Sequence, residues 1–139
     1  MRPLYESDAD RDAEENARRR LEHVWKCEIV KLPMRYNCDF AAERDGTVVG
    51  LLEYKRRYFR RDKYPTTMLE AKKVRETLIL AGACNCHAHF VVEFDDGLFY
   101  IGMNEEPDQI SIGGRKDRDD PQDIGIYYYW DINKLKRIM

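Results

Sequence analysis

The segment from Asn37 to Arg56 constrains the fold most, because its pattern predicts a β-hairpin with apolar residues on both faces. Two runs suited to strands, Asn37–Arg44 and Thr47–Arg56, flank the turn dipeptide Asp45-Gly46. Side chains alternate along a strand, and each face carries apolar residues: Ala41, Val49 and Leu51 on one, Phe40, Val48 and Leu52 on the other. A sheet of this kind is covered on both sides, which favours a helix on each face.

The same hairpin carries three charged residues that suggest a chemistry. Asp39 lies on the first strand, and Glu53 and Lys55 lie two residues apart on the second, so Glu53 and Lys55 project from one face. Two carboxylates and an ammonium that converge at a sheet edge can hold a divalent metal next to an activated water. The pattern therefore predicts a site of the nuclease type.

The hairpin register decides whether Asp39 joins this group. A two-residue Asp45-Gly46 loop places Asp39 opposite Leu52 and leaves Glu53 on the other face. A three-residue loop, Arg44-Asp45-Gly46, with its glycine left-handed in a bulge, moves the register and puts Asp39 on the face of Glu53. Because a slip of one residue destroys the site, the hypothesis predicts the bulged three-residue turn.

A helix is predicted before the hairpin. Asp8 or Asp10 can cap it, and it runs to about Trp25. Its apolar stripe at helical spacing consists of Ala13, Ala17, Leu21, Val24 and Trp25. Glu14 falls inside this stripe, where a carboxylate requires a partner. The alternative is a solvated acid paired with Arg18 at i+4.

The rest of the chain alternates strands and helices. Strands are predicted at Cys27–Leu32, His87–Phe94, Leu98–Met103 and Ile124–Ile132, a helix at Met68–Ala81 capped by Thr66 or Thr67 and stopped by Gly82, and a short final helix begun by Asn133. Residues 1–7 and 104–123 are expected to be flexible. The order predicts one α/β (α+β) domain over residues 1–139, with a mixed central sheet flanked by helices.

Composition sets limits on partners and compartment. The net charge is only −2, but the stretch from Lys55 to Lys63 holds six basic residues and one acid, and local fields rather than net charge steer a polyanion. No apolar run approaches the roughly 20 residues that span a bilayer, and no signal peptide is recognisable. The four cysteines show no disulfide framework, so a cytoplasmic location is expected.

A second cluster, Cys84-x-Cys86-His87-x-His89, has poor spacing for zinc. Structural zinc sites use cysteine pairs two to four residues apart and histidine pairs three to five apart. We therefore interpret these side chains as packing and hairpin-edge residues. The sequence contains no P-loop and no GxGxxG motif.

The order helix, three-stranded meander, helix, strand, with Asp39 followed by Glu53-x-Lys55, resembles the PD-(D/E)XK nuclease superfamily over residues 8–103. Cys38 stands where the family name has proline. The segment Glu14-x-x-Ala17-x-x-x-Leu21 is similar to the helix that supplies an extra acid in many members. The short length and the loop with Gly113-Gly114-Arg115 are similar to small phage-borne members, which would place the protein in the host cytoplasm.

This resemblance implies a restriction-endonuclease-like αβββαβ core and a role for each residue of the site. Asp39, Glu53 and the carbonyl of Tyr54 would bind Mg²⁺ or Mn²⁺, and Lys55 would orient the attacking water. Glu14 would complete a second metal position or hold a metal-bound water. The substrate would be structured or branched DNA, cut by an endonuclease, and cutting both strands calls for a homodimer.

The expected nucleic-acid contacts are basic or aromatic and lie beside the site: Arg56, Arg57, Arg60, Arg61, Lys63, Tyr64 and Lys72. Two other interpretations remain open. One is a catalytically silent nuclease-like protein that binds nucleic acid or serves phage assembly. The other is an interaction domain in which Asp39, Glu53 and Lys55 form an ordinary surface ion pair.

Overall fold

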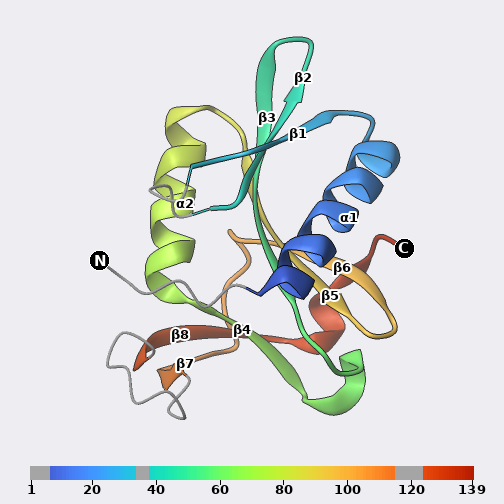
Figure 1. Cartoon of the computed structure of the whole chain (residues 1–139). Helices are drawn as coiled ribbons and strands as arrows, with labels where there is room; N and C mark the ends of the chain where they lie inside the picture. Colours follow the sequence, from blue (N-terminus) through green and yellow to red (C-terminus); the bar gives the residue numbers. More distant parts are fainter. Residues whose placement is uncertain (1–6, 34–37, 115–123) are drawn as a thin grey trace.

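The computed structural model describes residues 7–33, 38–114 and 124–139. Its centre is a six-stranded mixed sheet with helix α1 (Asp8–Trp25) on one face and helix α2 (Ala71–Ala83) on the other (Figure 1). The sheet order is β1-β2-β3-β5-β6-β9. These strands are β1 (Glu28–Lys31), β2 (Phe40–Arg44), β3 (Thr47–Arg56), β5 (His87–Phe94), β6 (Gly97–Gly102) and β9 (Lys136–Arg137).

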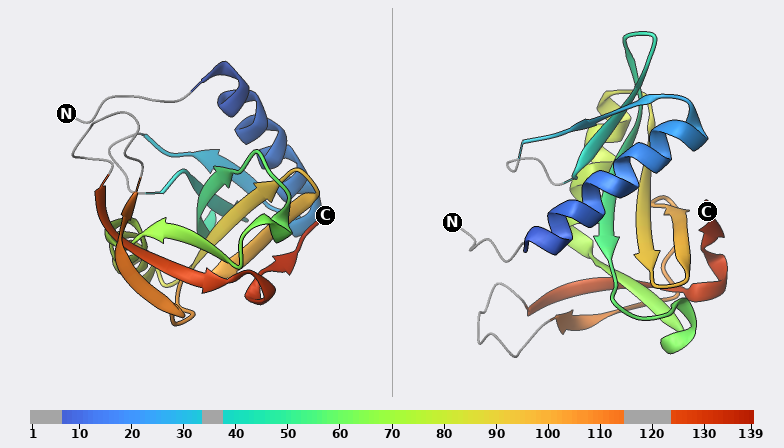
Figure 2. Two further views of the ribbon diagram at one scale, coloured as in Figure 1. Left: turned by 90° about the horizontal axis from the view of Figure 1, so that it is seen from below. Right: turned by 45° about the vertical axis from the view of Figure 1, so that its right-hand side comes forward.

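Strands β3 and β5 are parallel and joined through α2, whereas the other neighbours in this sheet are antiparallel. A second, antiparallel sheet lies across one end of the first (Figure 2). Its order is β4-β8-β7, formed by β4 (Thr66–Glu70), β8 (Ile124–Asp131) and β7 (Gln109–Gly114). The predicted α+β class with helices on both faces is confirmed, but the separate second sheet was not predicted.

Two apolar clusters lie on opposite faces of the large sheet. On the α1 side, Ala17 and Leu21 of the predicted stripe pack with Leu52 and Val91. On the α2 side, the cluster includes Val74 and extends into the second sheet through the fully buried Trp130. Burial of these side chains, at about 25 cal/mol per Å² of apolar surface, fixes both helices against β3, the strand that carries Glu53.

Helix α1 begins where predicted, but its cap is different. The N-cap is Ser7, whose hydroxyl accepts the backbone N–H of Asp10 at 3.1 Å, and Asp10 accepts the N–H of Ser7 at 3.3 Å. The expectation that Asp8 or Asp10 is the cap is therefore wrong. This reciprocal capping box also fixes Ser7, which we had assigned to a flexible segment.

The predicted helix at Met68–Ala81 is wrong in its first turn and at its end. Thr66–Glu70 form strand β4, in which Thr67 and Leu69 are buried and pair with Trp130 and Tyr128 of β8. A threonine before an apolar run is compatible with a helix cap or a strand, and the tertiary pairing decides for the strand. The helix begins at Ala71 and passes Gly82 to end at Ala83.

Two further segments differ from expectation. Part of the supposedly flexible 104–123 region is strand β7, which pairs with β8 along its whole length. Residues 115–123, like residues 1–6, lie outside the described residues. The C-terminal helix is one 3₁₀ turn, η3 (Ile132–Lys134), capped by Asp131 rather than begun by Asn133. A second 3₁₀ turn, η1 (Arg61–Lys63), interrupts the basic loop.

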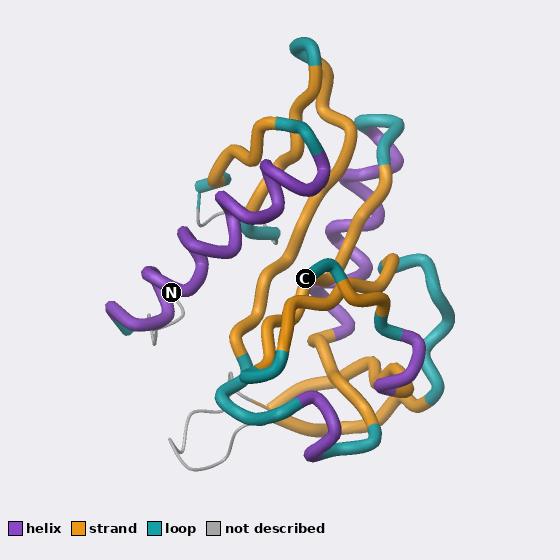
Figure 3. The backbone as a smooth tube through the Cα atoms, turned by 90° about the vertical axis from the view of Figure 1, so that its right-hand side faces the viewer, coloured by secondary structure: helices purple, strands orange, loops and turns teal. Residues whose placement is uncertain are grey.

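The β2–β3 hairpin projects beyond the helices, while its lower half runs between them (Figure 3). Within the described part of the chain, no helix has the length and apolar character needed to cross a membrane.

Candidate active site

The turn between β2 and β3 has two residues, not the predicted three. Asp45 and Gly46 both have positive φ, 53° and 78°, and Arg44 pairs with Thr47. This is the backbone of a tight hairpin turn that matches the strand twist. The prediction of a bulged three-residue turn is therefore wrong.

A bulge nevertheless occurs further along the hairpin, at Val49. Pairing runs from Glu43 with Val48 directly to Ala42 with Gly50, so Val49 is the extra residue on β3. The bulge moves the register by one residue, and Phe40 then pairs with Leu52.

One residue beyond that pair, Asp39 also lies opposite Leu52, so Asp39 and Phe40 share this partner on β3. The backbone N–H of Asp39 donates to the carbonyl of Leu52 at 2.9 Å. The charge of Asp39 nevertheless acts on Glu53, so the two acids lie near each other, although the predicted turn does not bring them together.

Glu53 is a buried carboxylate, with only 1% of the residue exposed. Its Oε1 atom lies 2.8 Å from Nζ of Lys73 and 3.5 Å from Nζ of Lys55. Burial raises the pKa of Glu53 above its ordinary value, and the charge of Asp39 raises it further, against the opposing effect of the two lysines. A group of this kind gains from any additional cation.

The two lysines beside Glu53 differ in their protonation equilibria. Burial lowers the pKa of Lys55, and the attraction of Glu53 restores it only in part. Burial also disfavours the charged form of Lys73, but its ion pair and hydrogen bond with Glu53 outweigh burial, so the pKa of Lys73 is raised. Lys73 therefore neutralises Glu53, while Lys55 is the lysine that releases its proton more readily.

Asp39 is held by both neighbouring strands. Its Oδ2 atom accepts the backbone N–H of Tyr54 at 2.8 Å, and its Oδ1 atom lies 3.6 Å from Nζ of Lys31 on β1. The same lysine lies 2.5 Å from Oε1 of Glu14 on α1. The structure thus connects Glu14 to Asp39 through Lys31, and Arg18 pairs instead with Glu15 and Glu22.

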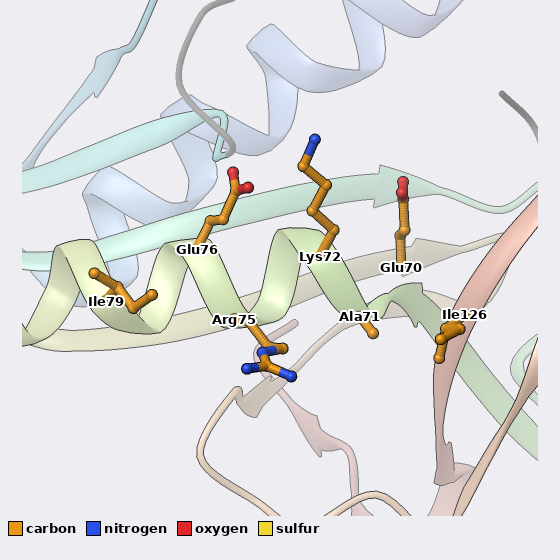
Figure 4. Close-up of a pocket in the computed structure, with 7 residues that line it drawn as sticks. All are labelled: Glu70, Ala71, Lys72, Arg75, Glu76, Ile79 and Ile126. Carbon is orange, nitrogen blue, oxygen red and sulfur yellow. The ribbon is translucent and has the colours of Figure 1, made fainter.

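The lysine of α2 that reaches Glu53 is Lys73, whereas Lys72, predicted to face the site, is exposed. Lys72 lines a hollow of about 410 Å³ on the outer side of α2 (Figure 4). Because the helix begins at Ala71, Lys73 lies one turn before the buried Thr77 and shares its side of the helix. That i, i+4 spacing is the sequence signal that could have identified Lys73.

Tyr54, between Glu53 and Lys55, is anchored on the opposite face of the sheet. Its hydroxyl donates to Oε1 of Glu93 at 2.6 Å, and Arg20 of α1 pairs with the other oxygen of Glu93 at 2.6 Å. Burial and this hydrogen bond raise the pKa of Tyr54. The network fixes the centre of β3, and with it the direction of its two charged neighbours.

The basic loop after β3 folds onto the β5–β6 turn. Arg56 lies 2.8 Å from Asp95 and Arg60 lies 3.6 Å from Asp96, so acidic residues offset part of the positive charge of this loop. The other predicted contacts lie in the same loop. Arg57 donates to the carbonyl of Met68, and Arg61 packs over Phe99. Lys63 lies over the rings of Phe59 and Tyr64, and Tyr64 is half exposed.

Within the Cys84–His89 cluster, His89 packs as expected, whereas Cys84 and His87 are exposed. His89 contacts Trp25 and Tyr100, with ring centroids 5.9 and 5.8 Å apart, and burial lowers the pKa of His89. Among the residues that the structure describes, no three His, Cys, Asp or Glu side chains form a group suited to a metal.

The donor set at Asp39 and Glu53 is nevertheless compatible with Mg²⁺ or Mn²⁺. Both side chains are hard oxygen donors on one face, and the buried Glu53 carries a charge that desolvation disfavours. Backbone carbonyls such as that of Tyr54 supply the third oxygen in sites with few carboxylates. The residues present therefore fit a divalent cation of this class.

Two comparisons with known proteins match the chain. The model of the family described as "Phage putative PDDEXK endonuclease" matches residues 1–138. Among solved structures, the Holliday junction resolvase Hjc from the archaeal hyperthermophile Archaeoglobus fulgidus is similar, with a TM-score of 0.58 and 13% identity. The similarity covers 91% of this chain and 92% of the resolvase. No curated protein sequence matches.

Proposed function

Because the chain belongs to the family of phage PDDEXK endonucleases, within the PD-(D/E)XK nuclease superfamily, we propose that Asp39, Glu53 and Lys55 form a divalent-metal-dependent centre that hydrolyses DNA phosphodiester bonds. The observation that carries this proposal is the buried Glu53 carboxylate near the charge of Asp39, with Lys55 on the same face of the strand. An incidental surface ion pair would not bury a carboxylate beside a second acid.

Asp39, Glu53 and the carbonyl of Tyr54 would hold Mg²⁺ or Mn²⁺. When bound, the ion lowers the pKa of a water and offsets the negative charge that develops on the phosphoryl oxygens. Lys55 orients the attacking water and stabilises that charge.

Lys73 favours the ionised form of Glu53 before the substrate arrives, since their ion pair opposes the effect of burial. Glu14, on α1, lies at the border of the centre, where the Lys31 ammonium connects it to Asp39. The backbone N–H of Tyr54 fixes the orientation of the Asp39 carboxylate. Together these groups organise the oxygen donors in advance of substrate binding.

The proposed substrate is branched DNA. This finer step rests on the similarity in fold to a Holliday junction resolvase. Positively charged residues around the β3 exit, including Arg57 and Lys63, would contact the phosphate backbone. Symmetric cutting of two strands would use a homodimer.

The test compares cleavage of a four-way DNA junction, a linear duplex and a supercoiled plasmid in Mg²⁺, Mn²⁺ or EDTA. We expect metal-dependent endonucleolytic cleavage, strongest on the junction. Glu53→Gln and Lys55→Met should each lower the rate at least about 100-fold, because each removes a group that acts on the transition state. Lys134→Met removes a lysine paired with Asp108 far along the chain and should leave the rate unchanged.

Circular dichroism of each variant separates lost chemistry from lost folding. Cleavage by folded Glu53→Gln or Lys55→Met at the wild-type rate would contradict the proposed centre. Metal-independent junction binding without cleavage would instead support a catalytically silent DNA-binding protein.

A further inference from the structure

Lys31 connects two carboxylates that come from different elements. Its Nζ atom lies 2.5 Å from Oε1 of Glu14 and 3.6 Å from Oδ1 of Asp39. Glu14 belongs to helix α1, Lys31 to the edge strand β1, and Asp39 directly precedes β2. An ammonium in this position bridges the carboxylates as a bound cation would.

The backbone and an aromatic ring hold Lys31 in this place. Lys31 pairs with Phe40 across the β1–β2 ladder, and the N–H of the next residue, Leu32, donates to the carbonyl of Asp39 at 2.8 Å. The Nζ atom also lies 5.1 Å from the centre of the Phe40 ring, within the range of a cation–π interaction. The ammonium therefore has three attractive groups around it, the two carboxylates and the ring of Phe40, and none of them depends on a substrate.

Space does not exclude a metal ion here. A hollow of about 240 Å³ opens beside Lys31, lined by Arg11, Glu14, Glu15, Lys31 and Phe40, and the Lys31 side chain is 49% exposed. A hydrated cation could reach Glu14 through this hollow. What opposes it is the positive charge already present between the two carboxylates.

Lys31 differs in this respect from the lysines at the other end of the site. Lys73 and Lys55 both approach one oxygen of Glu53, its Oε1 atom, and so supplement the charge balance of a single carboxylate. Lys31 connects two acids. In a two-metal nuclease, a shared carboxylate and a helix acid of this kind would hold the second ion.

We propose that Lys31 acts as the second cation of the centre, so that the enzyme takes one divalent ion, at Asp39 and Glu53, and not two. This inference rests on the proposed function and deepens it, since it assigns the metal stoichiometry to one residue. Lys31 is then a positioning residue: its ammonium lies between Glu14 and Asp39 and prevents a second metal ion from binding to them. It also gives Glu14 the role of partner to Lys31.

Calorimetric titration of the full-length protein with Mn²⁺ tests this assignment. Wild type should bind one ion per chain. Lys31→Met, which removes the charge and keeps the length of the side chain, should bind two, and the double variant Lys31→Met/Glu14→Gln should return to one. Electron paramagnetic resonance should show coupling between two Mn²⁺ ions in Lys31→Met alone.

Two controls isolate the charge at this position. Lys31→Arg keeps the cation and should bind one ion. Lys134→Met removes a lysine that is 42% exposed and lies 2.8 Å from Asp108, and it should also bind one. Two ions in wild type, or a single ion in folded Lys31→Met, would overturn the inference while leaving the centre at Asp39 and Glu53 in place. No Mn²⁺ bound to wild type would instead overturn that centre, and the inference with it.

Discussion

Glu53 is buried and surrounded by charged side chains, so its effect on the free energy of unfolding depends on these neighbours. Burial and Asp39 disfavour its ionised form, and Lys73 and Lys55 favour that form. A carboxyl group whose pKa is raised on folding binds its proton more tightly in the folded state. The free energy of unfolding therefore falls as the pH rises from the ordinary pKa of glutamate through the raised one.

Lys73→Met should make the free energy of unfolding depend more strongly on pH. Without the ion pair at 2.8 Å, the pKa of Glu53 rises further and the ionised form becomes more costly. We expect a loss of about 3 kcal/mol in the free energy of unfolding at pH 8, the lower end for breaking a buried ion pair. At pH 5 the loss should be smaller, because Glu53 then takes up a proton. Urea unfolding at the two pH values measures the difference.

Lys72→Met is the matched control for this prediction. It removes the same charge from the neighbouring position of the same helix, but Lys72 is exposed, so the change should stay within about 0.5 kcal/mol at both pH values. An equal loss in Lys73→Met at pH 5 and pH 8 would show that packing, and not the ionisation of Glu53, explains the effect.

Among the residues of the site, the sequence predicted those that lie close together in the chain. Glu53 and Lys55 share a face because strand alternation is a property of two adjacent positions. Lys73 and Lys31 were not predicted at the site, since their partners lie 20 and 8 residues away in the chain and on other elements. Only the packing of α2 and β1 against the hairpin brings them to the acids.

In the β2–β3 hairpin the acids of the predicted site are near each other, but the turn and the register differ from the prediction. The turn dipeptide follows its local preference for two residues with positive φ. The extra residue that shifts the register of the hairpin is Val49, which carries no turn signal and is 36% exposed. Alternation of apolar residues does not reveal a bulge, because both faces of this hairpin are apolar.

Deletions at the bulge test this register. Deleting Val49 removes the unpaired residue, so Ala42 can still pair with Gly50 and Phe40 with Leu52, and Asp39 keeps its place near Glu53. Because the pairs next to the site are unchanged, we expect this variant to fold and to keep Mn²⁺ binding and junction cleavage within about tenfold of wild type, a difference of about 1.4 kcal/mol. Calorimetry and cleavage assays measure both.

Deleting both Val49 and Gly50 moves the register by one further residue. Phe40 then pairs with Glu53 in place of Leu52, so Glu53 turns to the face covered by α1, as any one-residue slip requires. Mn²⁺ binding should be lost in this double deletion even where circular dichroism shows a folded protein. Loss of binding in the folded single deletion would contradict the register argument.

The second sheet changes the surface of the whole molecule, and its existence was the least predictable feature of the fold. Strands β4 and β7 lie in segments that local patterns assigned to a helix and a flexible loop. They become strands by pairing with β8, which is 54 or more residues from β4 in the chain. Long-range pairing of this kind has no signature in a local window.

One face of this sheet is covered by the core at Trp130 but is exposed to solvent further along β8 and on β7. Trp130 is buried, but Ile126 on the same face of β8, and Ile110 and Ile112 on β7, are 56–78% exposed. Ile79 of α2 is 74% exposed, and it lines the same hollow as Ile126 (Figure 4). These four isoleucines form an exposed apolar patch, of the kind that marks a protein interface.

We propose that the patch binds a second copy of the chain. The rim of the hollow carries two acids and two bases, Glu70, Glu76, Lys72 and Arg75. A two-fold interface brings a surface against itself, so a rim with both signs of charge can match its own copy. A dimer formed here would also supply the two centres that symmetric cutting of both DNA strands requires.

Sedimentation equilibrium tests this interface. Wild type should form a dimer at micromolar concentration, and Ile112→Lys should raise the dissociation constant at least about tenfold, because burial of an isoleucine contributes about 1.5–3 kcal/mol. Val30→Lys is the control, since Val30 is 40% exposed on β1, at the far edge of the large sheet from the patch. It should leave the dissociation constant unchanged. A dimer that Ile112→Lys does not weaken would place the interface on another surface, and a monomeric wild type at these concentrations would contradict the patch as a dimer interface.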